Sequence, residues 1–303
     1  MLLESFLAAG IALATPILLA ALGELLVERA GVLNIGLEGF MLFGAFAAAA
    51  ATTETGSPGL GAMAGAAAGI AIALVFAVVV VGFAADQIVV GAAVNLLALG
   101  TTGALYRGMY GQTGAALVLP TLPALRIPGL ADLPIVGTAL FSQNLLVYLA
   151  LAGTGAVAFL LFRTGLGLRL RALGDHPLAA ASLGIAVRGH RMATIAVAGA
   201  LAGLGGATLV LATSNTFVEG VTAGRGFIAL AVVVFARWNP VAALAGALLF
   251  GFASALQFQL QAADLGVPYQ LFLTLPYLAT LAVLAFSRGA AGAPRALGTT
   301  YDA

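Results

Sequence analysis

The feature that most limits what this chain can fold into is its series of long apolar runs, which short polar breaks separate. A helix needs roughly 20 apolar residues to cross the hydrocarbon core of a bilayer. Several of the runs reach that length without an internal charge. Of the 303 residues, 62% are hydrophobic and 8% are charged, whereas about a quarter of the residues in an average soluble domain are charged. The sequence therefore predicts an all-α, polytopic integral membrane protein.

The polar breaks divide the chain into about nine predicted transmembrane helices. The seventh of these, residues 226–236, is too short to cross a bilayer alone unless it begins earlier or is a half-helix. No second domain is visible, so residues 1–303 are expected to form a single membrane domain. The N-terminus carries no basic segment, so we expect a retained first helix rather than a cleaved signal peptide. The predicted spans are residues 5–23, 36–52, 60–83, 87–106, 144–162, 192–212, 226–236, 241–260 and 269–287.

Arginine positions predict the orientation in the membrane, because positive residues near the ends of spans stay in the cytoplasm. The loop of about residues 163–191 holds five of the chain's twelve basic residues, which places this loop inside. Alternation along the chain then puts the C-terminus in the cytoplasm and the N-terminus outside. It also puts a loop of about residues 107–143 outside the cell. The four prolines between residues 120 and 134 exclude a continuous helix there and predict a structured loop or lid.

Charge and composition exclude several functions. A net charge of +1 leaves no basic face for nucleic acid. The absence of cysteine excludes disulfides and thiolate metal sites. An intramembrane enzyme would need a nucleophile with a base, or clustered metal ligands, within the spans. Both histidines, His176 and His190, lie in the predicted cytoplasmic loop. We therefore expect a protein that is not an enzyme and holds no metal.

The stretch "GDHPLAAASLGI" within the cytoplasmic loop is patterned as a short capped helix. Asp175 is the predicted N-cap, Pro177 belongs to the first turn, and Gly184 is the predicted C-terminal stop. Small side chains between these residues would allow another protein to approach closely. The stretch is therefore either a docking element or a positively charged membrane anchor with an incidental helix.

Four stretches, in order along the chain, carry a resemblance to a known family. They are "TPILLAALGELLVERAGVLNIGLEGFMLFGAFAA", "DQIVVGAAVNLLALGTTGALY", "GDHPLAAASLGI" with the following "ATIAVAGALAGLGGATL", and "GRGFIALAVVVFARWNPVAALAGALLFG". Together they resemble the permeases of ATP-binding cassette (ABC) importers, in the branch that serves nucleosides, simple sugars and branched-chain amino acids. The "ERAGVLNIGLEG" and "FARWNP" wording is most similar to nucleoside uptake permeases. Sugar permeases of the branch usually carry a Gly-Ile-Asp-Leu-Ser pattern where this chain has "GVLNIGLEG".

The resemblance implies an importer subunit in the bacterial plasma (inner) membrane that carries nucleosides, purine nucleosides in particular. It implies no cofactor on this chain, because a partner ATPase binds ATP and Mg²⁺. Three partners are implied: a cytoplasmic ATP-binding subunit, a second permease that is a homologue in a heterodimer, and an extracytoplasmic substrate-binding lipoprotein. The residues expected to meet the ATP-binding subunit are Gly174, Asp175, His176, Ala180, Gly184 and Ile185.

Polar residues within the spans are further candidates, because ionisable groups and amides at membrane depth usually face a cavity or a partner. The glycines of "GVLNIGLEGF" predict a break in helix. Asn34 and Glu38 there are either gate or pathway residues, or a cytoplasmic N-cap and a first-turn acid.

Gln87, Asn95 and Thr102 fall on roughly one side of the span 87–106. The amide of Asn95 either meets substrate or bonds a neighbouring helix. For a nucleoside, whose hydroxyls and base edges need both donors and acceptors, amides are suitable partners. Asn215 lies in a loop that either lines the outer mouth or is solvated.

For two further groups a structural interpretation is favoured over a functional one. Glu24 and Glu28 share one face at the end of the first span, and we expect a solvated helix end there. Trp238 lies in a tight turn, and we expect it to anchor the chain at the membrane interface.

Other cargoes remain open, namely simple sugars and branched-chain amino acids. An ion-coupled secondary transporter would need carboxylates within its spans. Glu38 and Asp86 are the only plausible ones, and both lie near predicted membrane edges. Dependence of uptake on ATP rather than on an ion gradient would separate the two mechanisms.

Overall fold

The computed structural model describes residues 2–111, 117–134, 136–262, 269–275, 278 and 292–301. Within these ranges six helices are long and apolar enough to cross a membrane, and they match six of the predicted spans. The predicted spans 36–52 and 226–236 are helices that are not among the six, and 269–287 lies mostly outside the described residues. The predicted count of nine is therefore not confirmed. The six are Leu3–Arg29, Pro58–Gly82, Gln87–Tyr110, Leu145–Arg163, Val187–Thr213 and Pro240–Ala262.

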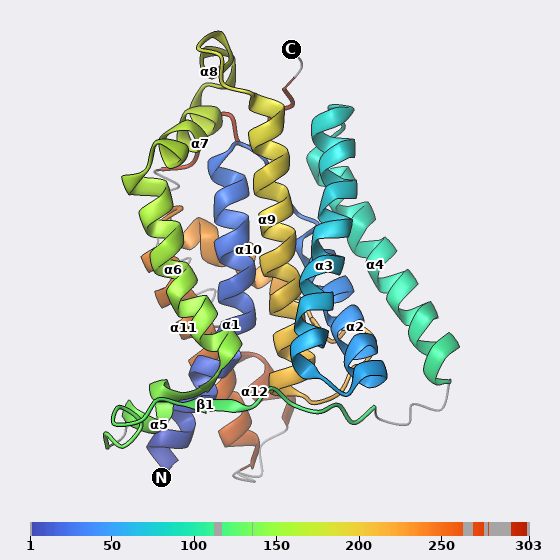
Figure 1. The fold of residues 1–303 in the computed structure, drawn as a ribbon, viewed down its shortest axis with the longest axis vertical. Helices are drawn as coiled ribbons and strands as arrows, with labels where there is room; N and C mark the ends of the chain where they lie inside the picture. The colour runs from blue at the N-terminus through green and yellow to red at the C-terminus, as the bar shows by residue number, and fades with distance from the viewer. Residues whose placement is uncertain are drawn as a thin grey trace.

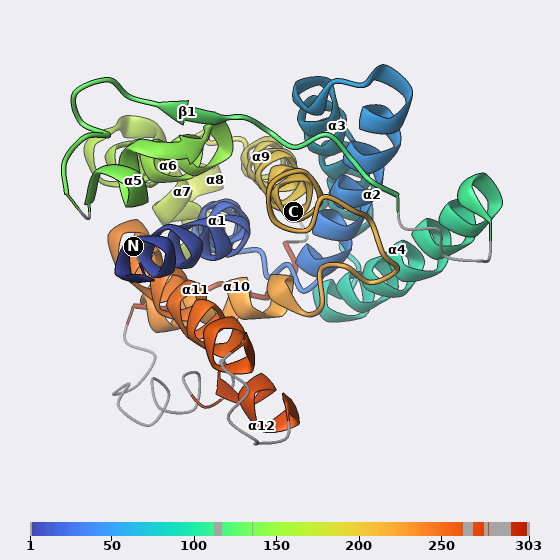
Figure 2. The same ribbon diagram turned by 90° about the horizontal axis from the view of Figure 1, so that it is seen from below.

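Two helices, α1 and α9, form the centre of the bundle, and three groups of helices surround them (Figures 1 and 2). α9 continues into a π-helical turn, η2, and α3 into a similar turn, η1. The central pair is α1 (Leu2–Arg29) and α9 (Val187–Thr208) with η2 (Leu209–Thr213). The first group is α2 (Leu37–Thr55), α3 (Pro58–Ala77) with η1 (Val78–Gly82), and α4 (Gln87–Tyr110). The second group is α6 (Leu145–Arg163) with the short helices that precede and follow it. The third is α10 (Arg225–Phe235), α11 (Pro240–Ala262) and α12 (Tyr269–Leu273).

Glycines allow α2, α3 and α9 to pack with their backbones in contact. A side chain on Gly44 of α2 would collide with the backbone of Gly203 on α9. A side chain on Gly69 of α3 would likewise collide with the carbonyl of Gly199. Membrane helices rely on such close approach because lipid supplies no hydrophobic driving force between them. These glycines explain why α9 can run through the middle of the bundle.

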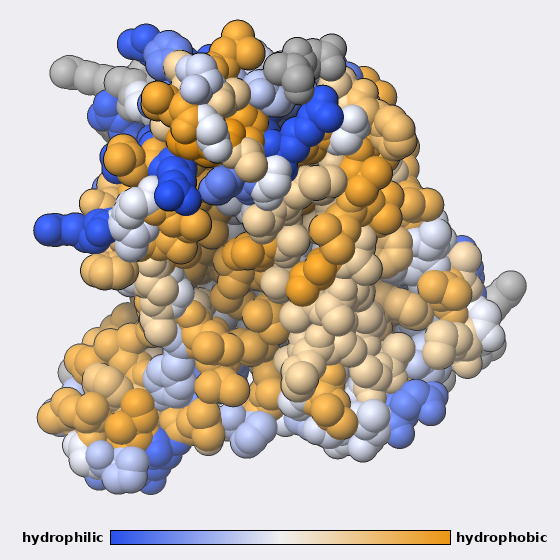
Figure 3. All heavy atoms as spheres, turned by 45° about the horizontal axis from the view of Figure 1, so that its top comes forward, coloured by the Kyte–Doolittle hydropathy of each residue, from blue (hydrophilic) through white to orange (hydrophobic). Residues whose placement is uncertain are grey.

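The two ends of the bundle differ in structure and charge. One end carries the loop of about residues 107–143, which forms α5 (Val136–Phe141) and a small antiparallel pair, β1 (Ala124–Arg126) and β2 (Ser142–Asn144), with Ala124 opposite Asn144. The other carries α7 (Gly165–Asp175), α8 (Pro177–Ser182) and residues 292–301 (Figure 1). Figure 3 shows hydrophilic residues gathered at the α7–α8 end above flanks that are mostly apolar. Over the residues that the structure describes, the fold is all-α as predicted, except for the two short strands.

Candidate functional site

The segment predicted to dock another protein forms two helices, α7 and α8, rather than one. α7 continues through Asp175, so His176 is the N-cap of α8, and its side chain makes no capping hydrogen bond. The predicted N-cap role of Asp175 is therefore wrong. Its carboxylate instead accepts a hydrogen bond from the backbone N–H of Arg295 at 3.4 Å.

Gly184 ends α8 as predicted. Its φ of +79° is one that residues with a Cβ rarely adopt. The N–H of Gly184 bonds the carbonyl of Ala181 at 2.9 Å, and the N–H of Ile185 bonds that of Ala180 at 3.2 Å. This pair of bonds is a Schellman motif, which satisfies carbonyls that a helix end leaves free.

The exposed surface of this segment is more apolar than its small residues suggest. Leu178 and Leu183 are 68% and 82% exposed. Of the predicted contact residues, Asp175, His176 and Gly184 are exposed and Ile185 is half-buried. Ala180 and Gly174 are buried, and a side chain on Gly174 would collide with the carbonyl of Arg29.

Residues 292–301 pack against the base of this segment. The N–H of Ala296 bonds the carbonyl of Gly174 at 2.8 Å. Further along, the carbonyl of Thr299 accepts a bond from Nε2 of Gln87 at 3.3 Å. The C-terminal segment therefore links α7 to the start of α4 at the same end of the molecule.

The segment between α1 and α2 is irregular, and buried side chains satisfy its backbone. Oε1 of Glu24 accepts a hydrogen bond from the N–H of Asn34 at 3.1 Å, and Oε2 accepts one from Nδ2 of Asn34 at 3.0 Å. Both residues are fully buried. The prediction that Glu24 lies on a solvated helix end is wrong, because the chain after α1 folds back over that face.

Glu28 and Trp238 were also misplaced by sequence reasoning. Nε1 of Trp238 donates to Oε2 of Glu28 at 2.5 Å, and both residues are buried. Nη2 of Arg29 donates to the carbonyl of Trp238 at 2.9 Å. The turn between α10 and α11 is therefore hydrogen-bonded to the end of α1. The prediction that Trp238 is an interfacial anchor is wrong, because its side chain is buried in the bundle.

α4 supplies two amides to the same irregular segment. Oε1 of Gln87 accepts the N–H of Leu33 at 2.7 Å. Asn95 bonds on both sides of the break: Nδ2 donates to the carbonyl of Ile35 at 2.9 Å, and Oδ1 accepts the N–H of Gly39 at 2.8 Å. Irregular backbone at membrane depth is tolerated when protein buries it and pairs its polar groups.

Glu38 holds the N-terminus of a different helix, α10. Its Oε1 accepts the N–H of Gly224 at 2.8 Å, and its Oε2 accepts the N–H of Gly226 at 2.6 Å. A carboxylate is favourable at this end of a helix, where unpaired N–H groups carry partial positive charge. α10 has only 11 residues and begins at about mid-height of the bundle (Figure 1), as a half-helix would.

The segment between α1 and α2, together with the side chains of Glu24, Gln87 and Asn95 that bond it, is called the junction. The remaining predicted residues lie apart from it. The hydroxyl of Thr102 donates to the carbonyl of Ala98 on its own helix at 2.7 Å. Asn215, with a φ of +46°, accepts the N–H of Leu119 on its carbonyl at 2.9 Å. The structure thus brings together Asn34, Glu38, Gln87 and Asn95, and leaves Thr102 and Asn215 elsewhere.

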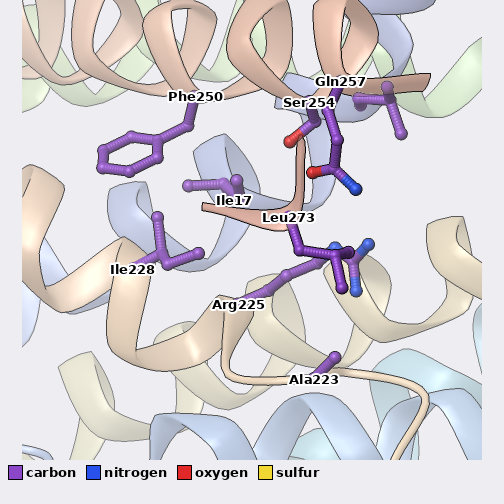
Figure 4. Close-up of a pocket in the computed structure, with 9 residues that line it drawn as sticks. Ile17, Ala223, Arg225, Ile228, Phe250, Ser254, Gln257 and Leu273 are labelled. Atoms are coloured by element: carbon purple, nitrogen blue, oxygen red, sulfur yellow. The ribbon is translucent and has the colours of Figure 1, made fainter. Parts of the chain in front are cut away.

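A cavity of about 300 Å³ lies beside the junction, between α1, α10, α11 and α12 (Figure 4). Leu13 and Ile17 come from the middle of α1, so the cavity lies at about mid-depth. None of the residues assigned above to the substrate pathway or to docking lines it. Serine and glutamine one helical turn apart within an apolar span were the signal that sequence reasoning missed. The described lining is Leu13, Ile17, Ala223, Arg225, Ile228, Phe250, Ser254, Gln257 and Leu273.

The polar groups of this cavity come from two directions. Gln257 is 8% exposed, and no hydrogen bond to its amide occurs among the described residues. Across the cavity, Nη1 of Arg225 donates to the carbonyls of Val221 and Thr222, each at 3.2 Å. Ala223, just before α10, has a φ of +46°, and a non-glycine residue in that conformation stores local strain.

Multiple apolar helices, a half-helix at mid-depth and a polar cavity beside it define a multi-pass membrane transport protein. A family model described as "Branched-chain amino acid transport system / permease component" matches residues 6–284. The chain belongs to this permease family, which confirms the predicted resemblance. It is a transport component rather than an enzyme.

Three relatives match over most of their length. The chain is 38% identical to the guanosine ABC transporter permease protein NupQ of Bacillus subtilis, over 95% of this chain and 93% of the relative. It is 35% identical to the nucleoside ABC transporter permease protein NupC of Lactococcus lactis, with the same coverage. It is 40% identical to the putative glucose ABC transporter permease protein TsgC13 of Haloferax volcanii, over 90% and 88%. No solved structure matches the chain.

Proposed function

We propose that this chain is the membrane-spanning subunit of an ABC importer that carries nucleosides, purine nucleosides in particular, into the cell. The observation that carries the proposal is the likeness to guanosine and nucleoside permeases over 95% of the chain. The cavity supports it, since amide and hydroxyl groups suit a cargo that offers donors and acceptors.

A simple sugar is the second candidate cargo, and the relative named as a putative glucose permease favours it. The family description points to branched-chain amino acids as a third. An ion-coupled mechanism has less support. Glu38 is bonded to two backbone N–H groups, and Asp86 is exposed and caps α4 through Ile88 and Val89.

The partners follow from the two ends of the bundle. The α7–α8 end, with its exposed leucines and exposed arginines such as Arg169 and Arg188, faces the cytoplasm and meets an ATP-binding subunit. That subunit binds ATP and Mg²⁺ and performs the hydrolysis. Residues 292–301 lie at the same end, so the C-terminal segment is cytoplasmic. The end that carries β1 and β2 faces a substrate-binding lipoprotein outside.

A second permease, a homologue of this chain, completes the pathway in the bacterial plasma membrane. Only 28% of the most apolar stretch of α4 is buried, against 72% for α1. α4 therefore offers a wide apolar face to lipid or to that second subunit.

The test is uptake of labelled nucleosides by cells that express this subunit with its ATPase, second permease and binding protein. We expect uptake that requires a functional ATPase and that unlabelled nucleosides, but not glucose or leucine, compete. Uptake that ignores the ATPase and follows an ion gradient would overturn the ABC mechanism. Competition by glucose alone would show that the cargo is a simple sugar and not a nucleoside.

Gly184 tests the docking segment. Gly184→Arg adds a long charged side chain at a position where an added Cβ would meet no atom within 4 Å beyond its chain neighbours, so we expect membrane insertion to persist and ATPase-dependent uptake to be lost. Gly184→Ala imposes similar backbone strain without the bulk, and we expect it to keep most of the uptake. Equal loss in both variants, or failure of Gly184→Arg to insert, would assign Gly184 to folding instead.

A further inference from the structure

The polar groups of the cavity beside α10 gather toward one side of it. Figure 4 shows Ile17, Ile228 and the ring of Phe250 on the opposite side, while Ser254 and Gln257 of α11 lie near Leu273, and Arg225 reaches toward them from α10. At about 300 Å³, its volume lies at the lower end of the range for small-molecule sites, roughly 300–1,000 Å³. A ligand that fits must be small and must offer both apolar and polar groups.

Gln257 indicates that the cavity is built for a ligand. Its side chain is more than nine-tenths buried, points into the cavity, and has no hydrogen-bond partner among the described residues. Buried amides nearly always have a partner, because an unpaired one is costly in an apolar environment. The amides of Gln87, Asn95 and Gln143 all obey that rule in this structure. Gln257 differs from them because its amide has no partner at either end among the described residues and faces the cavity, whereas the buried Asn34 lacks a partner only at Oδ1.

The chemistry of an amide narrows the ligand. A glutamine side chain presents one donor and one acceptor side by side, which pair with the adjacent donor and acceptor on the edge of a nucleobase. Ser254 lies one helical turn away on the same helix. Phe250 and the aliphatic side chains supply surfaces for the faces of a planar ring. The described lining contains no carboxylate, so the ammonium group of an amino acid would find no opposite charge.

The rim of the cavity is held in a fixed shape. The strained residue Ala223 and the left-handed Gly224 precede α10, and the carboxylate of Glu38 bonds the N–H groups of Gly224 and Gly226. Strained backbone persists only where the surroundings enforce it, and it concentrates at ligand sites. Glu38 is therefore a positioning residue for the cavity rather than a ligand contact.

We propose that this cavity binds a nucleoside in transit through the edge of its base, with the amide of Gln257 as the main recognition group and Ser254 as a second one. The proposal rests on the nucleoside importer function. It assigns cargo recognition within the membrane to α11 and α10, and leaves Asn34, Gln87 and Asn95 to hold the backbone.

The experiment measures equilibrium binding of tritiated guanosine to the purified permease–ATPase assembly without its binding protein. Gln257→Leu keeps the volume and removes the amide, and we expect affinity to fall about 10-fold or more, since two hydrogen bonds are lost. The melting temperature should stay unchanged or rise, because Leu leaves no buried amide unpaired. Unlabelled guanine should compete for the site, and free ribose should not.

Gln143→Leu is the matched control. Gln143 is equally buried, but its Nε2 donates to the carbonyls of Ala139 at 2.7 Å and Ala8 at 3.3 Å. We expect this variant to lower the melting temperature and leave guanosine affinity within about twofold. Unchanged affinity in Gln257→Leu, or competition by ribose equal to that by guanine, would overturn the proposal. If wild-type cells take up no nucleosides, the importer function itself fails, and that outcome is separate.

Discussion

Two polar regions adjoin each other at the start of α10, and their side chains are bonded in opposite ways. At the α1–α2 break, Glu24, Gln87 and Asn95 each bond backbone or side-chain groups of the junction. In the neighbouring cavity, Gln257 has no partner among the described residues and Ser254 has no bond there either. Both regions place side-chain amides in apolar surroundings.

The difference teaches that a polar residue in a membrane span is not by itself a site. A paired group stabilises irregular backbone that lipid would not tolerate. An unpaired group that faces a cavity has unused bonding capacity that a cargo can take up. The two regions predict opposite responses to substitution, in stability on one side and in ligand binding on the other.

Glu24→Ala should give the largest loss of stability. It leaves the backbone N–H and the side-chain amide of Asn34 buried without an acceptor, which costs about 3 kcal/mol or more. The expected result is a subunit that is largely misfolded or degraded, seen as loss of the monodisperse peak in detergent. Glu54→Ala, at an exposed acid on α2, is the control and should behave as wild type. A folded Glu24→Ala protein would contradict the role of the junction.

Glu38→Ala should lower stability less than Glu24→Ala, and it should affect both the junction and the cavity. It removes both acceptors at the start of α10, and we expect about 2 kcal/mol of lost stability together with weaker guanosine binding. Thermal unfolding and equilibrium binding measure the two effects. Glu38→Gln keeps one acceptor and should fall between wild type and Glu38→Ala. Weaker unfolding stability with unchanged binding would mean that the rim does not shape the cavity.

Gln87→Leu should cost about 1–2 kcal/mol, because it leaves the N–H of Leu33 unpaired and releases the carbonyl of Thr299. Guanosine affinity of the purified assembly should not change. A selective loss of affinity without loss of thermal stability would return Gln87 to the cargo pathway, where the sequence first placed it.

Glu219→Gln should have the smallest effect. Glu219 pairs with Arg107 at 2.7 Å, but both side chains are more than two-fifths exposed, and such surface pairs contribute about 0–1 kcal/mol. The melting temperature should be nearly that of wild type, with any difference smaller still at high salt. A large destabilisation would show that this outer pair, and not the junction, secures the loop before α10.

Six of the nine spans predicted from apolar runs match helices of spanning length in the described residues, because one stretch of sequence contains the information on whether a helix can cross a bilayer. Gly184 was predictable for a similar reason, since a helix stop depends on neighbouring residues. The half-helix α10 was anticipated only as one of two alternatives, because length alone does not show where a short helix lies.

The remaining site residues were not predictable, because their roles depend on contacts with residues that are distant in sequence. Glu28 and Trp238 are 210 positions apart, and Glu38 and Gly224 are 186 apart. No local pattern shows that Glu28 is buried or that Glu38 holds another helix. Gln257 was missed because a polar residue near the end of an apolar run looks like a boundary. Its burial arises only when α11 packs against α1 and α10.

The most direct measurement is the shift in melting temperature that guanosine causes in the purified assembly, compared between Asn95→Leu and Gln257→Leu. We predict that Asn95→Leu melts below wild type, having lost its bonds to Ile35 and Gly39, yet keeps the guanosine-induced shift. Gln257→Leu should melt at or above wild type and lose the shift. The reverse pattern, with the shift lost in Asn95→Leu and kept in Gln257→Leu, would contradict the division between the junction and the cavity.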